Sequence, residues 1–358
     1  MREEYGQKPD VPLFPVHRIS VVYNLKKTPA PSEPDDKYEE YDPISTVQSV
    51  ADAVSSFGFH VSLCEQDDDF FDRLREQAPS FVVNLAEGRG SARGREAQVP
   101  SILESLDIPF WGSDSVALAL ALDKLLTTRT LAGEGIPVPL SASFRGEDDL
   151  AEIPALFGKA DRFVIKPRFE GSSKGIFTDS VAHDETEMEE KIRRLWSRYG
   201  QPALAEEYLP GDEITVGVVG WEKPEVAGMM RISPRTPAEE FLYSIEEKRN
   251  YIERIRYEGP ETILPALRNS LEKSALAAFS ALELQDLARI DFRLDGGGVG
   301  RIIDVNPLPG LSPVYSDLPI LHRLSGGNYE ELLRFILKSA FSRYALAFPV
   351  PIEEGISS

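Results

Sequence analysis

Oxygen-bearing side chains recur at a spacing of two residues near the end of the chain. Arg289-Ile290-Asp291 is followed by Asp304-Val305-Asn306. Because side chains two residues apart on a strand share a face, each pair points the same way if its run is extended. The segment reads as two strands joined by a glycine-rich turn at 295–298, which predicts an antiparallel hairpin.

If the two faces of this hairpin match, two carboxylates, an amide oxygen and a guanidinium converge. Carboxylates about 4 Å apart repel by roughly 1–4 kcal/mol, so a cation between them is favourable. Oxygen ligands of this kind suit Mg²⁺, which commonly also binds substrate phosphates. A solvated face on an edge hairpin is the alternative interpretation, since charged residues interleaved with Ile, Phe and Val are common there.

The stretch FVIKPRFEGSSKGI, at 163–176, joins a strand-end lysine to a turn of small residues. Lys166 can reach a phosphate as a point charge. Gly171, Ser172 and Ser173 allow backbone N–H groups to approach phosphate oxygens closely. A hairpin with surface hydroxyls is an equally good interpretation of the turn alone, and the G-x-x-x-x-G-K-S/T pattern of a P-loop is absent from it.

A third stretch, AEEYLPGDE at 205–213, ends a strand in acids and turns at Pro-Gly. It could be an ordinary connection between domains. As a functional element it would be a hinge whose backbone reads an adenine edge while an acid binds the ribose hydroxyls.

Composition limits the classes of function. The 358 residues are enough for two or three domains, and the net charge of −20 argues against nucleic acid as a partner. No apolar run approaches the roughly 20 residues of a membrane span, and the first residues lack the apolar core of a signal peptide. The one cysteine, Cys64, fits a reducing cytoplasm and reads as buried filler.

Strand-like and helix-like segments alternate in the first third of the chain, which predicts a parallel sheet with helices on its faces. The predicted strands are 18–25, 59–65, 80–88 and 108–113, and the predicted helices are 45–58, 68–77 and 96–108. A helix opens at Asp123, and the remainder carries strands and helices around a polar loop at 238–260. The predicted divisions are an arm (1–17), an α/β domain (18–122), a central part (123–208), a third part with the hairpin (209–345) and a tail (346–358).

The order of these features resembles the ATP-grasp superfamily and, within it, D-alanine–D-alanine ligase. The resemblance runs from about residue 82 to 340, and its most specific stretches are DKLLTTRTLAGEGIPVP, VIKPRFEGSSKGI and ARIDFRLDGGGVGRIIDVNPLPGL. It implies a fold of mixed α/β and α+β type, namely a three-domain ATP-grasp architecture with an N-terminal parallel α/β (pre-ATP-grasp) domain.

The resemblance assigns the ATP site residue by residue. It places the phosphates on Lys124 and Lys166 beneath a flap formed by Gly171, Ser172 and Ser173. Its adenine contacts fall on Glu206, Glu207 and Leu209, and its ribose acid falls on Glu213.

The resemblance also assigns the reaction centre. A Tyr-x-x-x-x-Lys pattern ends at Lys248, a γ-phosphate contact. Arg289 would stabilise an acyl phosphate and a tetrahedral intermediate, so that Arg289, Lys248 and Ser172 are the catalytic candidates. Two Mg²⁺ ions, with Mn²⁺ as a substitute, would be held by Asp291, Asp304 and Asn306.

The chain departs from the family where the amino acids bind. The hairpin has Asp304-Val305-Asn306 in place of Glu-x-Asn, and Arg249 follows the loop lysine where tyrosine is usual. The family's His-Gly stretch becomes Asn84-Leu85-Ala86-Glu87-Gly88, and its early glutamate has no clear match in YEEYDPIS. Ser312 or Ser316 would read the second carboxylate.

These observations predict an ADP-forming carboxylate–amine ligase that makes a peptide bond through an acyl phosphate from small amino-acid-like substrates. One rival keeps the ATP site but joins other amino acids, or a peptide or natural-product carboxylate. A rival of another class is a nucleotide-binding regulator without turnover, which would not need Arg289 beside the metal ligands. The resemblance also suggests a homodimer.

Overall fold

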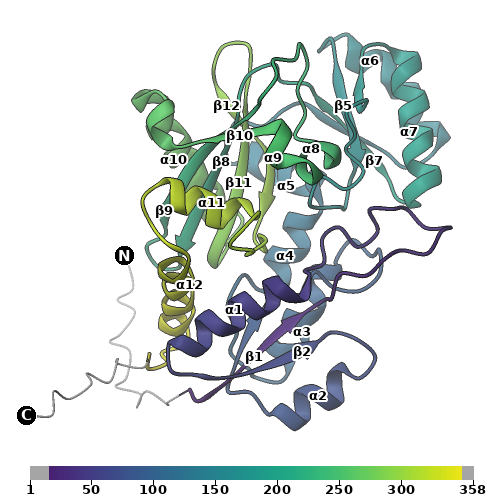
Figure 1. The fold of residues 1–358 in the computed structure, drawn as a ribbon. Coiled ribbons are helices and arrows are strands. Elements are labelled where there is room, and N and C mark those ends of the chain that lie inside the picture. Colours follow the sequence, from purple (N-terminus) through teal and green to yellow (C-terminus); the bar gives the residue numbers. More distant parts are fainter. Residues whose placement is uncertain (1–15, 349–358) are drawn as a thin grey trace, which may run out of the picture.

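The structure is a computed structural model that describes residues 16–348, so the predicted arm (1–17) and tail (346–358) lie largely outside the described residues. Figure 1 shows a small N-terminal sheet below two larger sheets. Within the described range no helix is long and apolar enough to cross a membrane.

The N-terminal part forms a parallel sheet, as predicted, with strand order β2-β1-β3. Its strands are β1 (Arg18–Tyr23), β2 (His60–Glu65) and β3 (Phe81–Asn84), and its helices are α1 (Ile44–Ser56), α2 (Phe70–Gln77), α3 (Gln98–Ser105) and α4 (Ser115–Leu122). β1 is buried along most of its length, as expected for an apolar strand covered on both faces. The predicted strand at 108–113 is wrong, because this segment makes only one bridge, between Phe110 and Val82.

The central part contains a four-stranded antiparallel sheet in the order β4-β7-β5-β6. Its elements are α5 (Lys124–Gly133), β4 (Ser141–Phe144), α6 (Ile153–Phe157), β5 (Phe163–Pro167), β6 (Val181–Ala182), α7 (Glu185–Tyr199) and β7 (Ala203–Glu207). α7 begins after its Asp184 cap and ends at Gly200, which adopts a positive φ. Met188 and Ile192 of α7 are fully buried in the core beneath this sheet.

The third part contains a five-stranded antiparallel sheet in the order β10-β9-β8-β11-β12. Its strands are β8 (Glu213–Gly220), β9 (Glu225–Pro234), β10 (Ile255–Glu258), β11 (Asp286–Leu294) and β12 (Gly300–Asn306), and its helices are α8 (Ile245–Arg249), α9 (Tyr251–Arg254), α10 (Pro265–Ala281), α11 (Asp317–Leu324) and α12 (Tyr329–Arg343). The predicted loop at 238–260 is wrong from residue 245 onward, where α8, α9 and β10 form.

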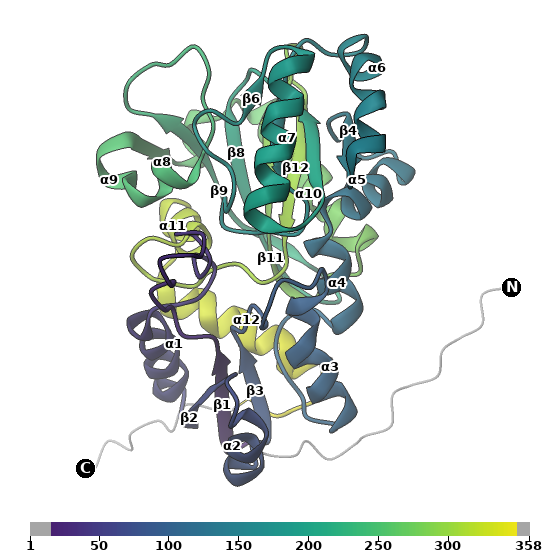
Figure 2. The same cartoon turned by 90° about the vertical axis from the view of Figure 1, so that its right-hand side faces the viewer.

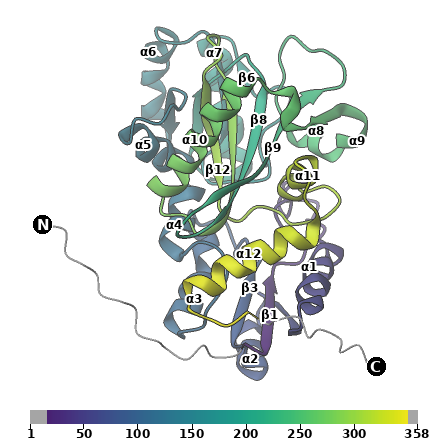
Figure 3. The same cartoon turned by 90° about the vertical axis from the view of Figure 1, so that its left-hand side faces the viewer.

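Helix α12 joins the N-terminal sheet to the five-stranded sheet. Figures 2 and 3 show it between the two. Its side chains Leu332, Leu333, Ile336 and Leu337 are fully buried in a core that also contains Val21 of β1 and Val219 of β8. Burial of each such side chain contributes about 1.5–3 kcal/mol, so the two sheets are fixed relative to each other.

A long loop at 26–43 reaches from β1 to the central part (Figure 1). Asp36 in this loop is fully buried and accepts hydrogen bonds from the Tyr199 hydroxyl (2.6 Å) and the Gly175 N–H (3.1 Å). The loop is therefore tied both to α7 and to the turn after β5.

Candidate active site

The predicted β11–β12 hairpin is present, and its register brings the two pairs of side chains together. Arg289 lies opposite Asn306, and Asp291 lies opposite Asp304, so all four side chains are on one face. The register shifts after Asp291, leaving Ile303 as a bulged residue. Its carbonyl accepts a hydrogen bond from Lys166 Nζ at 3.3 Å, which brings the end of β5 against the hairpin.

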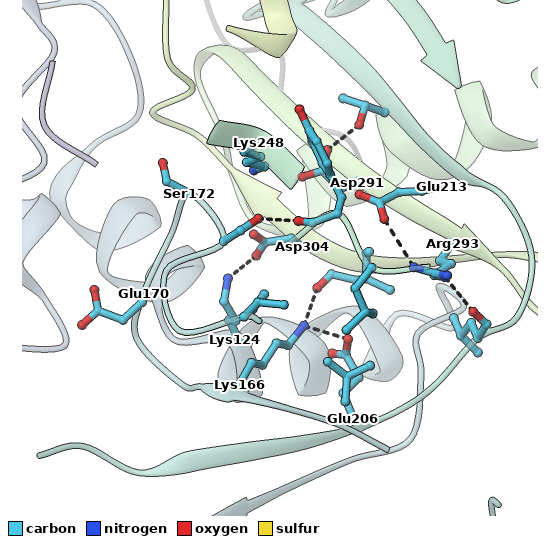
Figure 4. A pocket seen from close by; sticks show the side chains of 18 of the residues that line it. Lys124, Lys166, Glu170, Ser172, Glu206, Glu213, Lys248, Asp291, Arg293 and Asp304 are labelled. Atoms are coloured by element: carbon cyan, nitrogen blue, oxygen red, sulfur yellow. Dashed lines mark hydrogen bonds and ion pairs between the residues drawn. The ribbon is translucent and has the colours of Figure 1, made fainter. Parts of the chain in front are cut away.

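Both predicted phosphate-binding lysines point at carboxylates of this site (Figure 4). Lys124 Nζ donates to Asp304 Oδ1 at 2.6 Å, and Lys166 Nζ donates to Glu206 Oε1 at 2.7 Å. Burial disfavours the charged form of Lys124, but the Asp304 carboxylate outweighs burial and raises the lysine pKa. Burial would raise the pKa of Asp304, yet Lys124 and Lys166 hold it below its usual value. Both groups are therefore charged at neutral pH.

Lys124 owes its position to the start of α5. Asp123 caps this helix by accepting from the Leu126 N–H and also forms a two-pronged ion pair with Arg168, at 2.7 Å for each contact. Arg168 directly follows β5, so the cap couples the helix start to the strand that carries Lys166. Both lysines are thus placed by buried polar contacts that a single substitution would break.

The predicted adenine hinge lines the same cavity. Leu209 is an almost fully buried residue, and its N–H donates no hydrogen bond within residues 16–348. Buried backbone donors are rarely left unpaired, so this N–H fits a ligand acceptor such as an adenine nitrogen. The Leu209 carbonyl already accepts a hydrogen bond from Arg293 Nε at 2.6 Å.

Glu213, the predicted ribose acid, lies 3.4 Å from Arg293. Burial raises the pKa of Glu213 to about 7 despite the nearby guanidinium. The sequence analysis missed Arg293, although the spacing of two that relates Arg289 to Asp291 extends to it on the same strand. Figure 4 shows Arg293 beside Glu213, away from the two lysines.

The flap turn has unusual backbone geometry. Ser172 and Ser173 adopt φ angles of +50° and +58°, a region that costs free energy for residues other than glycine. The Ser173 hydroxyl donates to the Tyr243 carbonyl at 2.7 Å, and the Gly171 N–H donates to Glu40 Oε1 at 2.5 Å. Contacts from two distant segments thus hold the strained turn over the cavity.

Arg289 is the centre of the charged face. It makes a two-pronged contact with Asp291, with its Nη2 2.9 Å from Oδ2, and its Nη1 lies 3.4 Å from Asp317. Asp317, at the start of α11, was missed from the sequence because only the packing of α11 brings it to the hairpin. Lys248 lies 4.7 Å from the centre of the Tyr243 ring, and burial together with Arg289 lowers the pKa of Lys248.

The residues predicted to bind amino acids are less closely grouped. Arg249 lines a second cavity, which adjoins the one formed by the predicted ATP-site residues. Its guanidinium pairs there with Asp35 and Glu39, both at 2.8 Å. Ser316 lines that cavity as well, and its hydroxyl accepts from the Ser312 N–H at 3.0 Å. The Ser312 side chain is buried in a local turn, where it accepts from the Val314 N–H.

The predicted ATP-site and metal side chains line adjoining cavities. The first, of about 90 Å³, is lined by Lys124, Lys166, Ser172, Ser173, Glu206, Glu207, Leu209, Glu213, Lys248, Arg289, Asp291 and Asp304. Gly171 and Asn306 line a smaller one beside it. Lysines, an unpaired backbone N–H and carboxylates thus surround one space.

The donor chemistry of Asp291, Asp304 and Asn306 fits Mg²⁺. Within residues 16–348 no three His, Cys, Asp or Glu side chains are grouped as a metal site. Two carboxylates and an amide are a suitable set nonetheless, because Mg²⁺ usually keeps several waters and binds substrate phosphates. Each of the three has a partner in the protein: Asp291 has Arg289, Asp304 has Lys124, and the Asn306 amide oxygen accepts from the Leu308 N–H.

Comparison with known proteins identifies one matching family model and several similar sequences. Residues 157–338 match the family model described as D-ala D-ala ligase C-terminus. An uncharacterised protein of Sinorhizobium fredii is 30% identical over 309 residues, covering 83% of this chain and 87% of that protein. The D-alanine–D-alanine ligase of Granulibacter bethesdensis is 33% identical over 308 residues, covering 83% of this chain and 92% of the relative.

The fold has a counterpart among solved structures. The crystal structure of D-alanine–D-alanine ligase from Bacillus anthracis complexed with ATP aligns with a TM-score of 0.69 at 22% identity. The alignment covers 92% of this chain and 99% of that one. The three-sheet architecture is therefore that of the solved ligase.

Proposed function

The chain belongs to the D-alanine–D-alanine ligase family and is an ATP-dependent ligase; on that premise we propose that it joins the carboxylate of one amino acid to the amine of another. The supporting observation is the shared face of Arg289, Asp291, Asp304 and Asn306, which meets Lys124 and Lys166 in one place. Anionic reactants can meet only where charge is neutralised, and this face supplies cations and metal-type ligands together.

ATP would enter between the four-stranded and five-stranded sheets. The adenine would accept from the Leu209 N–H, the ribose would bind Glu213, and the phosphates would bind Lys124 and Lys166. Ser172 and Ser173 of the flap line this cavity of about 90 Å³, so the flap at 171–175 opens before ATP binds and closes after it. Ser172 and Ser173 then cover the phosphates.

Asp291, Asp304 and Asn306 would hold two Mg²⁺ ions, with Mn²⁺ as a substitute. When bound, the metal would neutralise phosphate charge and orient the γ-phosphate. As ATP enters, Lys124 exchanges its contact with Asp304 for a phosphate oxygen. Arg289 likewise loosens from Asp291 to face the reacting groups.

The reaction has two steps in this proposal. The substrate carboxylate attacks the γ-phosphate, so that an acyl–phosphate bond forms and ADP leaves. An amine then attacks the acyl carbon, and inorganic phosphate leaves as the amide forms. Lys248 and Arg289 stabilise the negative charge that develops on the transferred phosphoryl group and on the tetrahedral intermediate.

The names of the relatives make D-alanine the first substrate to test for both positions. ADP release would be followed with ATP, Mg²⁺ and a panel of D- and L-amino acids, and amide products would be identified by mass spectrometry. The proposal predicts ADP formation that depends on the amino acids and yields one dipeptide per ADP. If no amino acid stimulates ADP formation, the ligase assignment is rejected.

Two sequence-based predictions complete the proposal. A cytoplasmic location is supported by one buried free cysteine. A homodimer through the N-terminal part is expected from the family, and sedimentation of the purified chain would test it.

A further inference from the structure

A second cavity, of about 290 Å³, adjoins the ATP cavity. The residues that line both are Ser172, Tyr243, Lys248, Arg289 and Asp317. A ligand in the second cavity would therefore reach the γ-phosphate side of bound ATP. On the proposed function, this is the space where the amino-acid substrates react.

Charge is divided along this cavity. The end shared with the ATP cavity carries the cationic groups of Arg289 and Lys248, together with Asp317, which pairs with Arg289. The end formed by the N-terminal third of the chain carries carboxylates, namely Glu39, Glu40, Asp42 and Glu87. Lys26 and Arg249 also line this cavity, and both pair with Glu39. Cations are therefore in excess at the shared end, and carboxylates are in excess at the other.

Two of these carboxylates are neutralised by the protein itself. Glu39 pairs with Arg249 at 2.8 Å and with Lys26 at 3.2 Å. Glu40 pairs with the buried Arg95 at 2.6 Å. Neither is available to a ligand without breaking an existing contact.

The other two, Asp42 and Glu87, have no hydrogen-bond or ion-pair partner for their side chains among residues 16–348. Asp42 lies just before α1, and Glu87 follows β3, so the N-terminal sheet brings them to the same cavity wall. Burial raises the pKa of Asp42 to about 7, and burial together with Glu96 and Glu40 raises that of Glu87 well above its usual range. Such carboxylates favour a nearby cation, which would relieve both burial and repulsion.

At the end shared with the ATP cavity, one cationic side chain can bind a substrate carboxylate. Arg289 already faces Asp291 and Asp317, whereas Lys248 makes no ion pair within the described range and contacts the Tyr243 ring instead. One carboxylate at Lys248 and two ammonium groups at Asp42 and Glu87 would satisfy every unpaired charge along the cavity.

We propose that an amino-acid substrate of this ligase carries a second ammonium group, as in diaminobutyrate, ornithine or lysine. Its carboxylate faces Lys248 and Arg289, and Asp42 and Glu87 bind its two ammonium groups. The second amino acid must react through its neutral amine, so the ammonium groups come from the first amino acid. A first amino acid with an apolar side chain has a single ammonium group and leaves one of these carboxylates without a cation. Glu87 is accordingly a specificity-determining residue.

The test measures kcat/KM for ADP formation with D- and L-forms of alanine, diaminobutyrate, ornithine and lysine. A charge-assisted contact predicts that the best diamino acid exceeds alanine by about 10-fold or more. Glu87→Gln keeps the size of the side chain and breaks no contact, so it should fold. It should lower that ratio by about 10-fold.

Asp42→Asn provides a second variant and Glu76→Gln, at an exposed site on α2, a matched control that should change nothing. The proposal is overturned if alanine is preferred or if neither cavity variant alters the ratio. If no amino acid stimulates ADP formation, the ligase proposal fails, and calorimetry with an unreactive ATP analogue then decides this inference separately. Tighter binding of a diamino acid than of alanine, weakened by Glu87→Gln, supports it, and equal binding overturns it.

Discussion

Lys124 Nζ lies 2.6 Å from Asp304 Oδ1, although 180 residues separate them in the chain. The residue predicted to bind phosphate thus contacts a residue predicted to bind metal. In the ligand-free protein, each neutralises the other and holds the start of α5 against β12. The stability of the protein therefore depends on whether Asp304 has a cation beside it, either Lys124 or a bound metal ion.

Replacing Lys124 by methionine should therefore destabilise the protein unless metal is present. Asp304 would be left without its cation in a partly buried site, at a cost of about 1–3 kcal/mol once its partial exposure is considered. Melting temperatures with and without MgCl₂ check this: Mg²⁺ should raise that of Lys124→Met more than that of the wild type. Lys159→Met, at an exposed site, is the control. An equal response to Mg²⁺ would contradict metal binding at Asp304.

Replacing Asp291 by asparagine should abolish Mg²⁺-dependent turnover of ATP. The substitution keeps the size of the side chain but removes a carboxylate proposed to bind metal, so kcat should fall by about 100-fold or more. Circular dichroism should confirm an unchanged fold. Asp148→Asn, an exposed carboxylate, should keep full activity. Normal turnover by Asp291→Asn would show that the metal assignment is wrong.

The loop at 26–43 should control the flap. Asp36 holds the Gly175 N–H and the Tyr199 hydroxyl, and both its oxygens are buried. Asp36→Asn removes a buried charge-assisted contact, so we expect faster hydrogen exchange at 171–175 and a KM for ATP raised by about 3- to 10-fold. Unchanged exchange at those residues would indicate that the flap is held without the loop.

Glu213 should make ATP binding depend on pH. Because burial raises its pKa to about 7, the carboxyl is mostly protonated at pH 6 and mostly ionised at pH 8. The ionised form accepts hydrogen bonds from ribose hydroxyls more strongly, so KM for ATP should fall by about 3- to 10-fold as the pH rises across this range. Glu213→Gln should flatten the profile. A wild-type KM that rises with pH would argue against Glu213 as the ribose ligand.

Sequence reasoning found the parts of the site that depend on local spacing. Alternation indicated that Arg289 shares a face with Asp291 and that Asp304 shares a face with Asn306, but it left open whether the two faces match. The bulge at Ile303 makes them match, because the register nearer the turn, with Phe292 opposite Ile302, would otherwise put Ile303 opposite Asp291. Arg293 follows from the same alternation and was overlooked.

Other features depend on tertiary contacts that no local pattern encodes. Asp317 reaches Arg289 only because α11 packs against the sheet, and Glu40 reaches Gly171 only because the loop at 26–43 crosses to the flap. The predicted strand at 108–113 failed for a related reason. Phe110 and Trp111 are buried, but only Phe110 bridges to β3, so the apolar run reflects burial and not strand pairing.

The most direct test of the account follows oxygen from the substrate carboxylate. With ATP, Mg²⁺ and carboxylates labelled with heavy oxygen in D-alanine or the diamino acids, an acyl phosphate must transfer one labelled oxygen to inorganic phosphate when the amide forms. Mass spectrometry of the released phosphate should show one label per dipeptide. Unlabelled phosphate alongside amide product would contradict the acyl-phosphate mechanism, and absence of both amide and ADP would contradict the assignment as a ligase.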